Sequence, residues 1–276
     1  MKKYIIIPIL LIAVTAFSQY KPKKTGGIYR TGKDKIDKGW YFGLGATYMF
    51  AYNTETAELD STDALNNTYK TKYSADPNGK FGLYAEIGKF KMNNKRFINY
   101  TDFGLAYKWF RGGEDYTSES YQNTTLLATT AAEGSYGDHL ISGHFNAGYR
   151  YDASDKMFYV NGLGLNLDYA FIKGRTPTPA IPTLDYEDGP SDILGEVHYF
   201  FGMGFKTGRM IIMPILETPI LALYPFNHIK STHPYFNSRA RPFIIRVRFM
   251  FLKKGSKSCP AVSGNPFGVD YGNGVK

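Results

Sequence analysis

The sequence predicts an all-β protein, an eight-stranded antiparallel barrel that crosses a membrane with its strands. The first observation is composition, since the 276 residues include 23 Tyr, 20 Phe and 29 Gly, a mixture that favours strands and tight turns. The second is that eight segments alternate large apolar residues with small ones at a period of two. The third is that the connections between these segments are alternately long and short, as in bacterial barrels.

Residues 1–18 are predicted to be a secretory signal peptide. Two lysines precede an apolar run from Ile5 to Phe17, and small residues follow it, which is the order of charge, apolar core and cleavage site in such peptides. The apolar run is too short to span a membrane as a mature helix. We therefore expect cleavage near Ser18 and an exported mature chain.

Residues 19–38 form a basic segment that precedes the first strand. Its basic residues are Lys21, Lys23, Lys24, Arg30, Lys33, Lys35 and Lys38. The simplest interpretation is a solvated stretch that touches the membrane surface. The alternative is a docking strip for an acidic periplasmic partner, centred on Lys21, Lys23 and Lys24. Nucleic acid is not an expected partner of an exported protein, despite a pI of about 9.3.

The eight alternating segments justify the strands one by one. They are residues 39–52, 81–90, 99–109, 140–151, 159–171, 195–205, 211–224 and 242–254. Each is long enough to cross a bilayer at the tilt of a barrel strand. The segment at 211–224 is the weakest, because Pro214 and Pro219 cannot donate to a sheet ladder. Together the segments predict a barrel over residues 39–254.

A soluble β-sandwich would show the same alternation, with the apolar face buried as its core. Such a sandwich carries many Lys, Glu and Thr on its outer face. Here the second face consists mostly of Gly, Ala, Ser, Asn and isolated charges, as expected of a narrow lumen. Aromatic residues near the segment ends are Trp40, Tyr52, Tyr107, Trp109, Tyr151, Phe171 and Tyr224. Their position matches the interfacial girdles of membrane barrels.

The connections fix the predicted orientation. Polar inserts, expected to be loops, are residues 53–79, 112–137, 173–192 and 227–241. Tight turns are expected at residues 92–96, 152–156 and 207–209. Bacterial outer-membrane barrels have short periplasmic turns and long outer loops, so an even number of strands places both termini in the periplasm.

Charged residues occur on the second face, within otherwise apolar segments. They are Glu86, Asp102, Lys108, Arg150, Asp168, Glu196, Glu217, Arg246 and Arg248. Side chains nearly fill an eight-stranded barrel, and buried charges require partners. We therefore expect a charged network that plugs the lumen, with Arg246 and Arg248 paired to carboxylates such as Glu86 or Asp102.

The signal peptide, eight strands and alternating connections resemble the small outer-membrane barrels of the OmpA, OmpX and OmpW type, over residues 39–254. The Tyr-, Lys- and Asn-rich composition and the "AFSQ" junction resemble exported proteins of Bacteroidota. The resemblance implies an outer-membrane location. Bacteroidota use one such barrel, of the PorG type, as a partner of type IX secretion and gliding machinery. The large peptidoglycan-binding domain of OmpA has no counterpart here, so that role is not carried over.

Residues 255–276 form a tail rich in Gly, Pro and Ser, too polar and short for a core of its own. One interpretation is a disordered end. The other is a peptide that folds onto a periplasmic partner, with Phe267 and Tyr271 as anchors. The single cysteine, Cys259, lies in this tail; the favoured interpretation is a free thiol, and the alternative is a disulfide between two chains.

Motifs for chemistry are weak. The sequence contains no Gly-x-Ser-x-Gly or His-Glu-x-x-His pattern, and its five histidines are too scattered to suggest a metal. Ser142 and His144 could serve a lipid-modifying enzyme at the rim, but strand alternation explains the pair equally well. We expect no enzyme, no metal and no cofactor. The predicted function is a structural or docking barrel of an envelope or secretion assembly, and the alternative is a small porin or solute-binding barrel.

Overall fold

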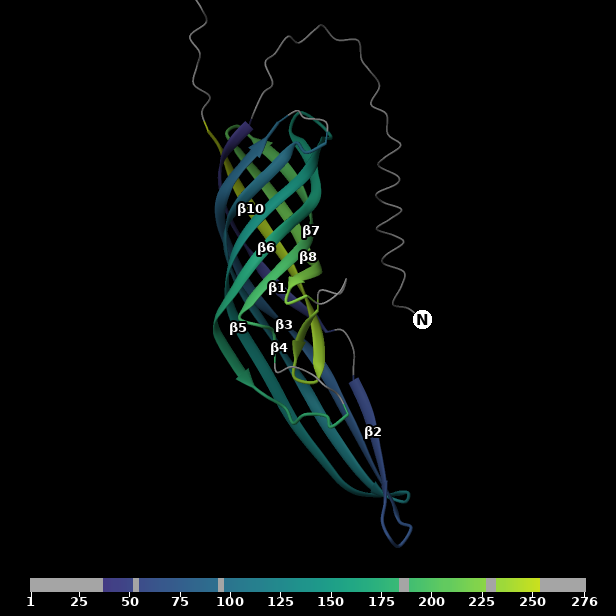
Figure 1. Ribbon diagram of the computed structural model, residues 1–276. Coiled ribbons are helices and arrows are strands. Elements are labelled where there is room, and N and C mark those ends of the chain that lie inside the picture. The colour runs from purple at the N-terminus through teal and green to yellow at the C-terminus, as the bar shows by residue number, and fades with distance from the viewer. Residues whose placement is uncertain (1–36, 52–54, 94–96, 184–188, 227–231, 254–276) are drawn as a thin grey trace, which may run out of the picture. The chain divides into compact units, whose positions relative to one another are not determined.

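The computed structural model describes residues 37–51, 55–93, 97–183, 189–226 and 232–253 (Figure 1). The strands are β1 (Asp37–Ala51), β2 (Glu55–Thr62), β3 (Thr68–Met92), β4 (Tyr100–Gln122), β5 (Thr125–Asp152), β6 (Met157–Thr176), β7 (Ile193–Thr207), β8 (Met210–Tyr224), β9 (His233–Tyr235) and β10 (Ser238–Leu252). Within these ranges no helix is long and apolar enough to cross a membrane. The predicted signal peptide, nearly all of the basic segment and the tail at 255–276 lie outside the described residues.

Eight of these strands form a closed antiparallel ring. The order is β1-β10-β8-β7-β6-β5-β4-β3, and β3 pairs back onto β1. The first strand therefore lies between the last ring strand, with Gly39 opposite Leu252, and β3, with Tyr41 opposite Gly88. Closure leaves the ring without an exposed edge. The all-β prediction of eight antiparallel strands is confirmed, and each predicted segment lies in a different ring strand.

The two prolines of β8 are accommodated where pairing is incomplete or irregular. Pro219 lies opposite His198, next to an irregularity in the β7–β8 ladder. The pairing of β8 with β10 ends at Glu217, before Pro219 is reached. Pro214 lies opposite Val247 of β10, but it has no partner in the β7–β8 ladder, whose pairing passes from Ile215 to Ile212. A proline that donates no hydrogen bond is tolerated at such bulges, so the weakest predicted segment is a ring strand.

The outer surface of the ring is apolar. Exposed side chains there include Leu44, Phe81, Leu83, Ile87, Phe103, Leu105, Ile141, Phe145, Leu163, Leu165, Leu167, Ile245 and Val247. The alternate residues of the same strands point inward and are buried, and many of them are polar or charged. A continuous apolar exterior around a polar interior is the arrangement of transmembrane barrels, and a water-exposed protein rarely shows so large an apolar surface.

Beyond one end of the ring, β3, β4 and β5 continue as a four-stranded sheet with β2 (Figure 1). We call this sheet the wing; it comprises residues 55–62, 68–79, 112–122 and 125–134. The prediction of loops over 53–79 and 112–137 was therefore wrong. Thr, Tyr and Ser give these stretches high strand propensity, but both faces of the sheet are largely polar, so no apolar alternation marks them.

The ring thus has two ends. The wing end carries the wing, and the turn end carries the short connections, the start of β1 and the end of β10. At the wing end, part of the predicted loop 227–241 forms a small hairpin of β9 and the start of β10. Phe236, with a φ of 52°, makes its turn. This hairpin matters because its side chains enter the mouth of the ring.

Candidate functional site

The centre of the lumen holds a charged network built around Arg248 of β10. Its guanidinium makes a bidentate pair with Glu86 of β3, with two N–O distances of 2.8 Å. Its remaining nitrogen, Nη1, donates to Asp102 Oδ2 and to Tyr100 Oη, each at 2.8 Å. The guanidinium carbon also lies 4.0 Å from the centre of the Tyr41 ring. Planar bidentate pairing of this kind is the strong form of an ion pair.

Arg246 extends the network along the same strand. Its Nε lies 3.1 Å from Glu86 Oε1, and its Nη1 donates to Glu217 of β8. The other oxygen of Glu217 accepts a hydrogen bond of 3.0 Å from Asn166. Both arginines are 1% exposed, so these charges are fully withdrawn from water. The structure therefore places Arg246 and Arg248 against Glu86, and each arginine has a second carboxylate partner, Glu217 for Arg246 and Asp102 for Arg248.

Two glycines of β1 make the room for this network. Gly43 lies opposite both Arg248 and Glu86, and Gly45 lies opposite Arg246. A Cβ on Gly43 would come within 2.5 Å of Glu86 Oε1, and one on Gly45 within 2.7 Å of Arg246 Cβ. The glycines of β1 thus allow charged side chains of its two neighbouring strands, β3 and β10, to reach each other inside the lumen.

The other predicted lumen charges are also buried, but in separate contacts. Lys108 donates to both carboxylate oxygens of Asp168 at 2.9 Å. Arg150 lies at the turn end, 3.1 Å from Asp152 and 3.4 Å from the sulfur of Met92. Glu196 lies 3.2 Å from His233 of the mouth hairpin. The sequence placed all of these charges in one lumen, and five of them share a single cluster: Glu86, Asp102, Glu217, Arg246 and Arg248.

Four polar side chains complete the network; His144 and His198 were expected to fill the lumen with hydrogen bonds, whereas Tyr41 and Asn146 were not singled out. Tyr41 Oη lies 2.7 Å from His144 Nε2 and donates to Asp102 at 3.2 Å. Asn146 donates to Asp102 at 2.8 Å and lies 2.6 Å from His198 Nε2. All four are inward-facing residues of ring strands, so strand alternation was the signal that could also have pointed to Tyr41 and Asn146.

At the turn end an apolar layer fills the lumen. It consists of Tyr41, Phe90, Met92, Tyr100, Phe158, Val160, Phe200, Ile211, Met213, Ile215 and Met250, each at most 3% exposed. Eight ring strands enclose a space that side chains of this size fill. The layer therefore closes the lumen on the turn-end side of the charged network.

At the wing end the mouth hairpin and its neighbours close the other side. Tyr235 stacks on Tyr136 with ring centres 3.5 Å apart, and its hydroxyl donates to Asp138 at 3.0 Å. Burial, and next the Asp138 carboxylate, raise the pKa of Tyr235 well above its ordinary range, so the hydroxyl stays protonated and remains a donor.

Glu114 of β4 holds the mouth hairpin in place. It is 1% exposed and accepts hydrogen bonds from the backbone and the side chain of Asn237, at 3.0 and 2.9 Å. Its Oε1 also accepts from the Thr178 hydroxyl at 2.6 Å. Asn237 in turn accepts from the Ile181 amide. The carboxylate thus ties the turn of the hairpin to the segment that follows β6.

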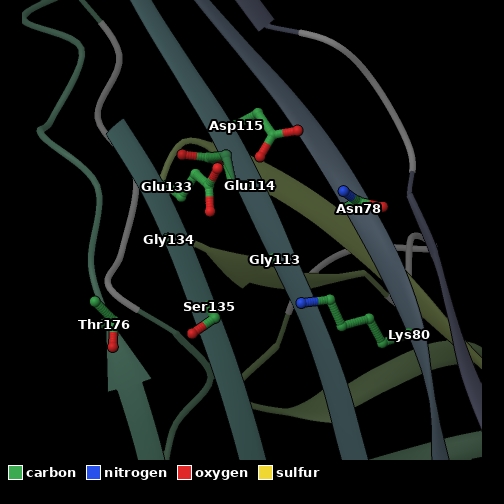
Figure 2. A pocket seen from close by; sticks show the side chains of 9 residues that line it. All are labelled: Asn78, Lys80, Gly113, Glu114, Asp115, Glu133, Gly134, Ser135 and Thr176. Atoms are coloured by element: carbon green, nitrogen blue, oxygen red, sulfur yellow. The ribbon is translucent and has the colours of Figure 1, made fainter. Parts of the chain in front are cut away.

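A cavity of about 530 Å³ lies on the wing (Figure 2). Its lining residues are Asn78, Lys80, Gly113, Glu114, Asp115, Glu133, Gly134, Ser135 and Thr176. Figure 2 shows the three carboxylates gathered on one side and Lys80 on another. The lining contains neither a histidine nor an aromatic ring. It is a polar hollow whose charged groups are three carboxylates and one lysine.

The remaining sequence candidates fall into two groups. Ser142 and His144 are buried inside the ring and do not stand at an exposed rim. Lys21, Lys23, Lys24, Phe267 and Tyr271 lie outside the described residues, so their predicted role in docking stays a prediction. Within the described ranges, no three His, Cys, Asp or Glu side chains are grouped so that they could hold a metal ion.

The ring with its apolar exterior and filled interior has the architecture of a small transmembrane β-barrel. No family model matches the chain, and no curated protein matches it. Solved structures that are similar to it include two autotransporter domains. The translocator domain of the autotransporter NalP from Neisseria meningitidis is 12% identical, with a TM-score of 0.23, over 89% of this chain and 95% of that one. The β-domain of the Bordetella autotransporter BrkA is 10% identical, with a TM-score of 0.22, over 78% and 99%. TM-scores this low say nothing about function.

Proposed function

We propose that this protein is a bacterial outer-membrane barrel with a sealed lumen, which serves as a structural or docking component of an envelope or secretion assembly. The observation that supports it is the filling of the lumen in three successive layers. These are the apolar layer at the turn end, the charged network around Arg248, and the mouth closed by Tyr235 and Glu114.

The charged layer supports a structural role over a conducting one. A pore that binds or passes solutes keeps some charged groups hydrated and without protein partners. Here each guanidinium of the central network faces carboxylates at ion-pair distance, and Lys108 is paired with Asp168. Moving a solute through this lumen would require breaking buried ion pairs, each of which is costly to separate.

Docking would then use the parts of the protein outside the ring. The basic segment at 19–38 and the tail at 255–276 both face the periplasm in the proposed orientation. Lys21, Lys23 and Lys24 would meet an acidic surface, and Phe267 and Tyr271 would insert as apolar anchors. A role in type IX secretion of the PorG kind is one specific form of this proposal.

Two measurements test the proposal. In planar bilayers the full-length mature protein should give no steady open conductance, and a stable open channel would overturn the sealed lumen in favour of a small porin. In mild detergent, tagged full-length protein should retain periplasmic or outer-membrane proteins that a version ending at Lys254 loses. A truncated protein that folds and keeps every partner would contradict docking through the tail, and then alanines at Lys21, Lys23 and Lys24 would test the basic segment.

A further inference from the structure

The wing leaves one strand edge of β5 open. β5 pairs with β4 from Thr125 to Gly148, but its pairing with β6 begins only at Ser135. Within the described part of the chain, no strand covers the other side of Thr125–Glu133. Beyond an irregularity near Leu127, residues 128–133 form an uninterrupted ladder with β4. A strand of this kind presents backbone N–H and C=O groups to any extended chain that approaches it.

The other free edge of the wing is β2, and it differs in chemistry. β2 carries Glu58 and Asp60 within three residues, and charges on an edge strand discourage pairing with another chain. From Thr125 to Ala132 the β5 edge reads "TLLATTAA", without a charge or a proline. The first seven of these residues are exposed. β5 therefore lacks the protection that β2 has.

We propose that the edge formed by residues 128–133 of β5 binds an extended segment of a partner polypeptide by strand addition, and that this segment alternates basic and apolar residues. This inference goes beyond the docking role proposed above. It concerns the opposite end of the ring and a different class of contact, in which main-chain hydrogen bonds supply affinity and alternate side chains supply specificity.

The two faces of the edge specify the alternation. On one face, Ala132 packs in a cluster with Tyr116 and Ile181. The side chains of the β5 edge on that face are all small, so they leave room for apolar side chains of a guest strand. Successive residues of a strand point to opposite faces. The opposite face therefore presents Glu133, with Asp115 directly across from it on β4. Carboxylates side by side on one face favour a guest strand with cations there.

The charge of the whole wing also favours a guest strand with basic residues. Residues 55–79 and 112–134 contain nine acidic side chains and two lysines, so the wing is strongly acidic although the full chain has a formal net charge of +9. A basic segment is drawn to such a surface, whereas an acidic one is repelled.

A second copy of this chain is a poorer occupant. It would bring an equally acidic wing into contact. Antiparallel pairing of two β5 edges also requires a two-fold axis perpendicular to the strands. Such an axis would turn the second barrel away from the membrane that holds the first. The occupant that fits is a different polypeptide at the cell surface.

A defined peptide tests the inference. The probe is a fluorescent peptide of alternating Lys and Val, offered to the full-length mature protein in detergent micelles, with binding followed by anisotropy. Three changes are compared: a probe with Glu in place of Lys, a probe with a central proline, and the variant Glu133→Lys. The matched control is Asp60→Lys, the same charge reversal on the other edge strand. Circular dichroism checks that both variants keep their strands.

We expect saturable binding of the Lys–Val probe. The proline probe should bind about five- to tenfold more weakly through lost backbone hydrogen bonds, and the Glu probe should not bind measurably. Glu133→Lys should weaken binding about two- to fivefold, while Asp60→Lys leaves it unchanged. No saturable binding up to about 1 mM probe, or equal weakening by both reversals, would overturn the proposal. Self-association of the wild type that Thr130→Pro abolishes would point instead to a second copy.

Discussion

The lumen and the wing are parts of the same continuous strands, yet they use charge in opposite ways. In the lumen, Arg248 and Glu86 are withdrawn from water and held by several hydrogen bonds each. In the wing, Glu58 and Lys70 form an ion pair of 2.5 Å, but their side chains are 50% and 36% exposed. The difference teaches that a short distance alone does not make an ion pair important for stability. Water screens the exposed pair and can solvate either charge if the other is removed. In the buried pair, a charge that loses its partner has no water to solvate it.

The largest effect expected from this comparison is at Arg248. Arg248→Met leaves Glu86 and Asp102 buried without their main cation, so the free energy of unfolding should fall by about 3–5 kcal/mol. Urea unfolding in lipid vesicles, followed by tryptophan fluorescence, measures it. Lys89→Met, on an exposed side chain of β3, is the matched control and should change little. If Arg248→Met is as stable as the control, the lumen network contributes nothing to stability.

The next effect tests the space that β1 provides for the network. Gly43→Ala places a methyl group within 2.5 Å of Glu86 Oε1, and overpacking of this kind costs about 1–3 kcal/mol. Gly143→Ala is the control on the same ring, since a Cβ there meets nothing within 4 Å. The same unfolding experiment compares them, and equal stability of the two variants would contradict the role given to Gly43.

A smaller and more local effect is expected at Glu114, between the lumen and the wing. Glu114→Gln turns an amide donor toward groups that themselves donate, so the mouth hairpin should loosen by about 1–2 kcal/mol. Hydrogen exchange at the Asn237 amide should become faster, while exchange in the ring strands stays the same. Faster exchange throughout the barrel would mean that Glu114 supports the whole ring and not the mouth alone.

The smallest effect belongs to the turn of the wing between β2 and β3. Asp63 accepts hydrogen bonds from the Asn67 side chain, the Asn67 amide and the Leu65 amide, and these lower its pKa below the ordinary 3.8, with the Asn67 side chain as the largest cause. A lowered pKa stabilises the turn at pH above 3.8, and the stabilisation disappears as pH falls below it.

This prediction is checked at the Leu65 and Asn67 amides. Their hydrogen exchange, corrected for intrinsic rates, should lose protection in acid, and Asp63→Asn should lose much of this pH dependence. Amides of the ring strands should keep their protection over the same range. A parallel loss of protection in ring and wing would show that the acid acts on the whole barrel.

Sequence alone was sufficient for the ring because lipid outside and packed side chains inside impose opposite demands on alternate residues. Phe249 and Arg248 are neighbours that could be assigned to opposite faces from that demand alone. For Arg248, the sequence predicted carboxylate partners such as Glu86 or Asp102 but could not choose between them. The choice of ion-pair partner depends on how far each strand is staggered against the next. The wing was missed because most side chains on both of its faces are polar, which removes the apolar alternation, so Thr68–Gly79 and Thr125–Gly134 look like loops. The hydrogen bonds between Glu114 and Asn237, which hold the mouth hairpin, join residues 123 positions apart in the sequence. No local sequence pattern indicates such a contact.

The position of both central arginines on the final strand has a consequence for how the barrel is made. Arg248 lies 162 residues after Glu86, so the carboxylates of β3 and β4 are synthesised long before the cations that neutralise them. A half-built sheet in lipid would hold Glu86 and Asp102 as bare charges, at a large cost. Biogenesis that delivered the strands to the bilayer one at a time would stall at that stage. Insertion should instead wait until β10 has arrived, so that a chain cut before Arg246 is rejected from the membrane and degraded.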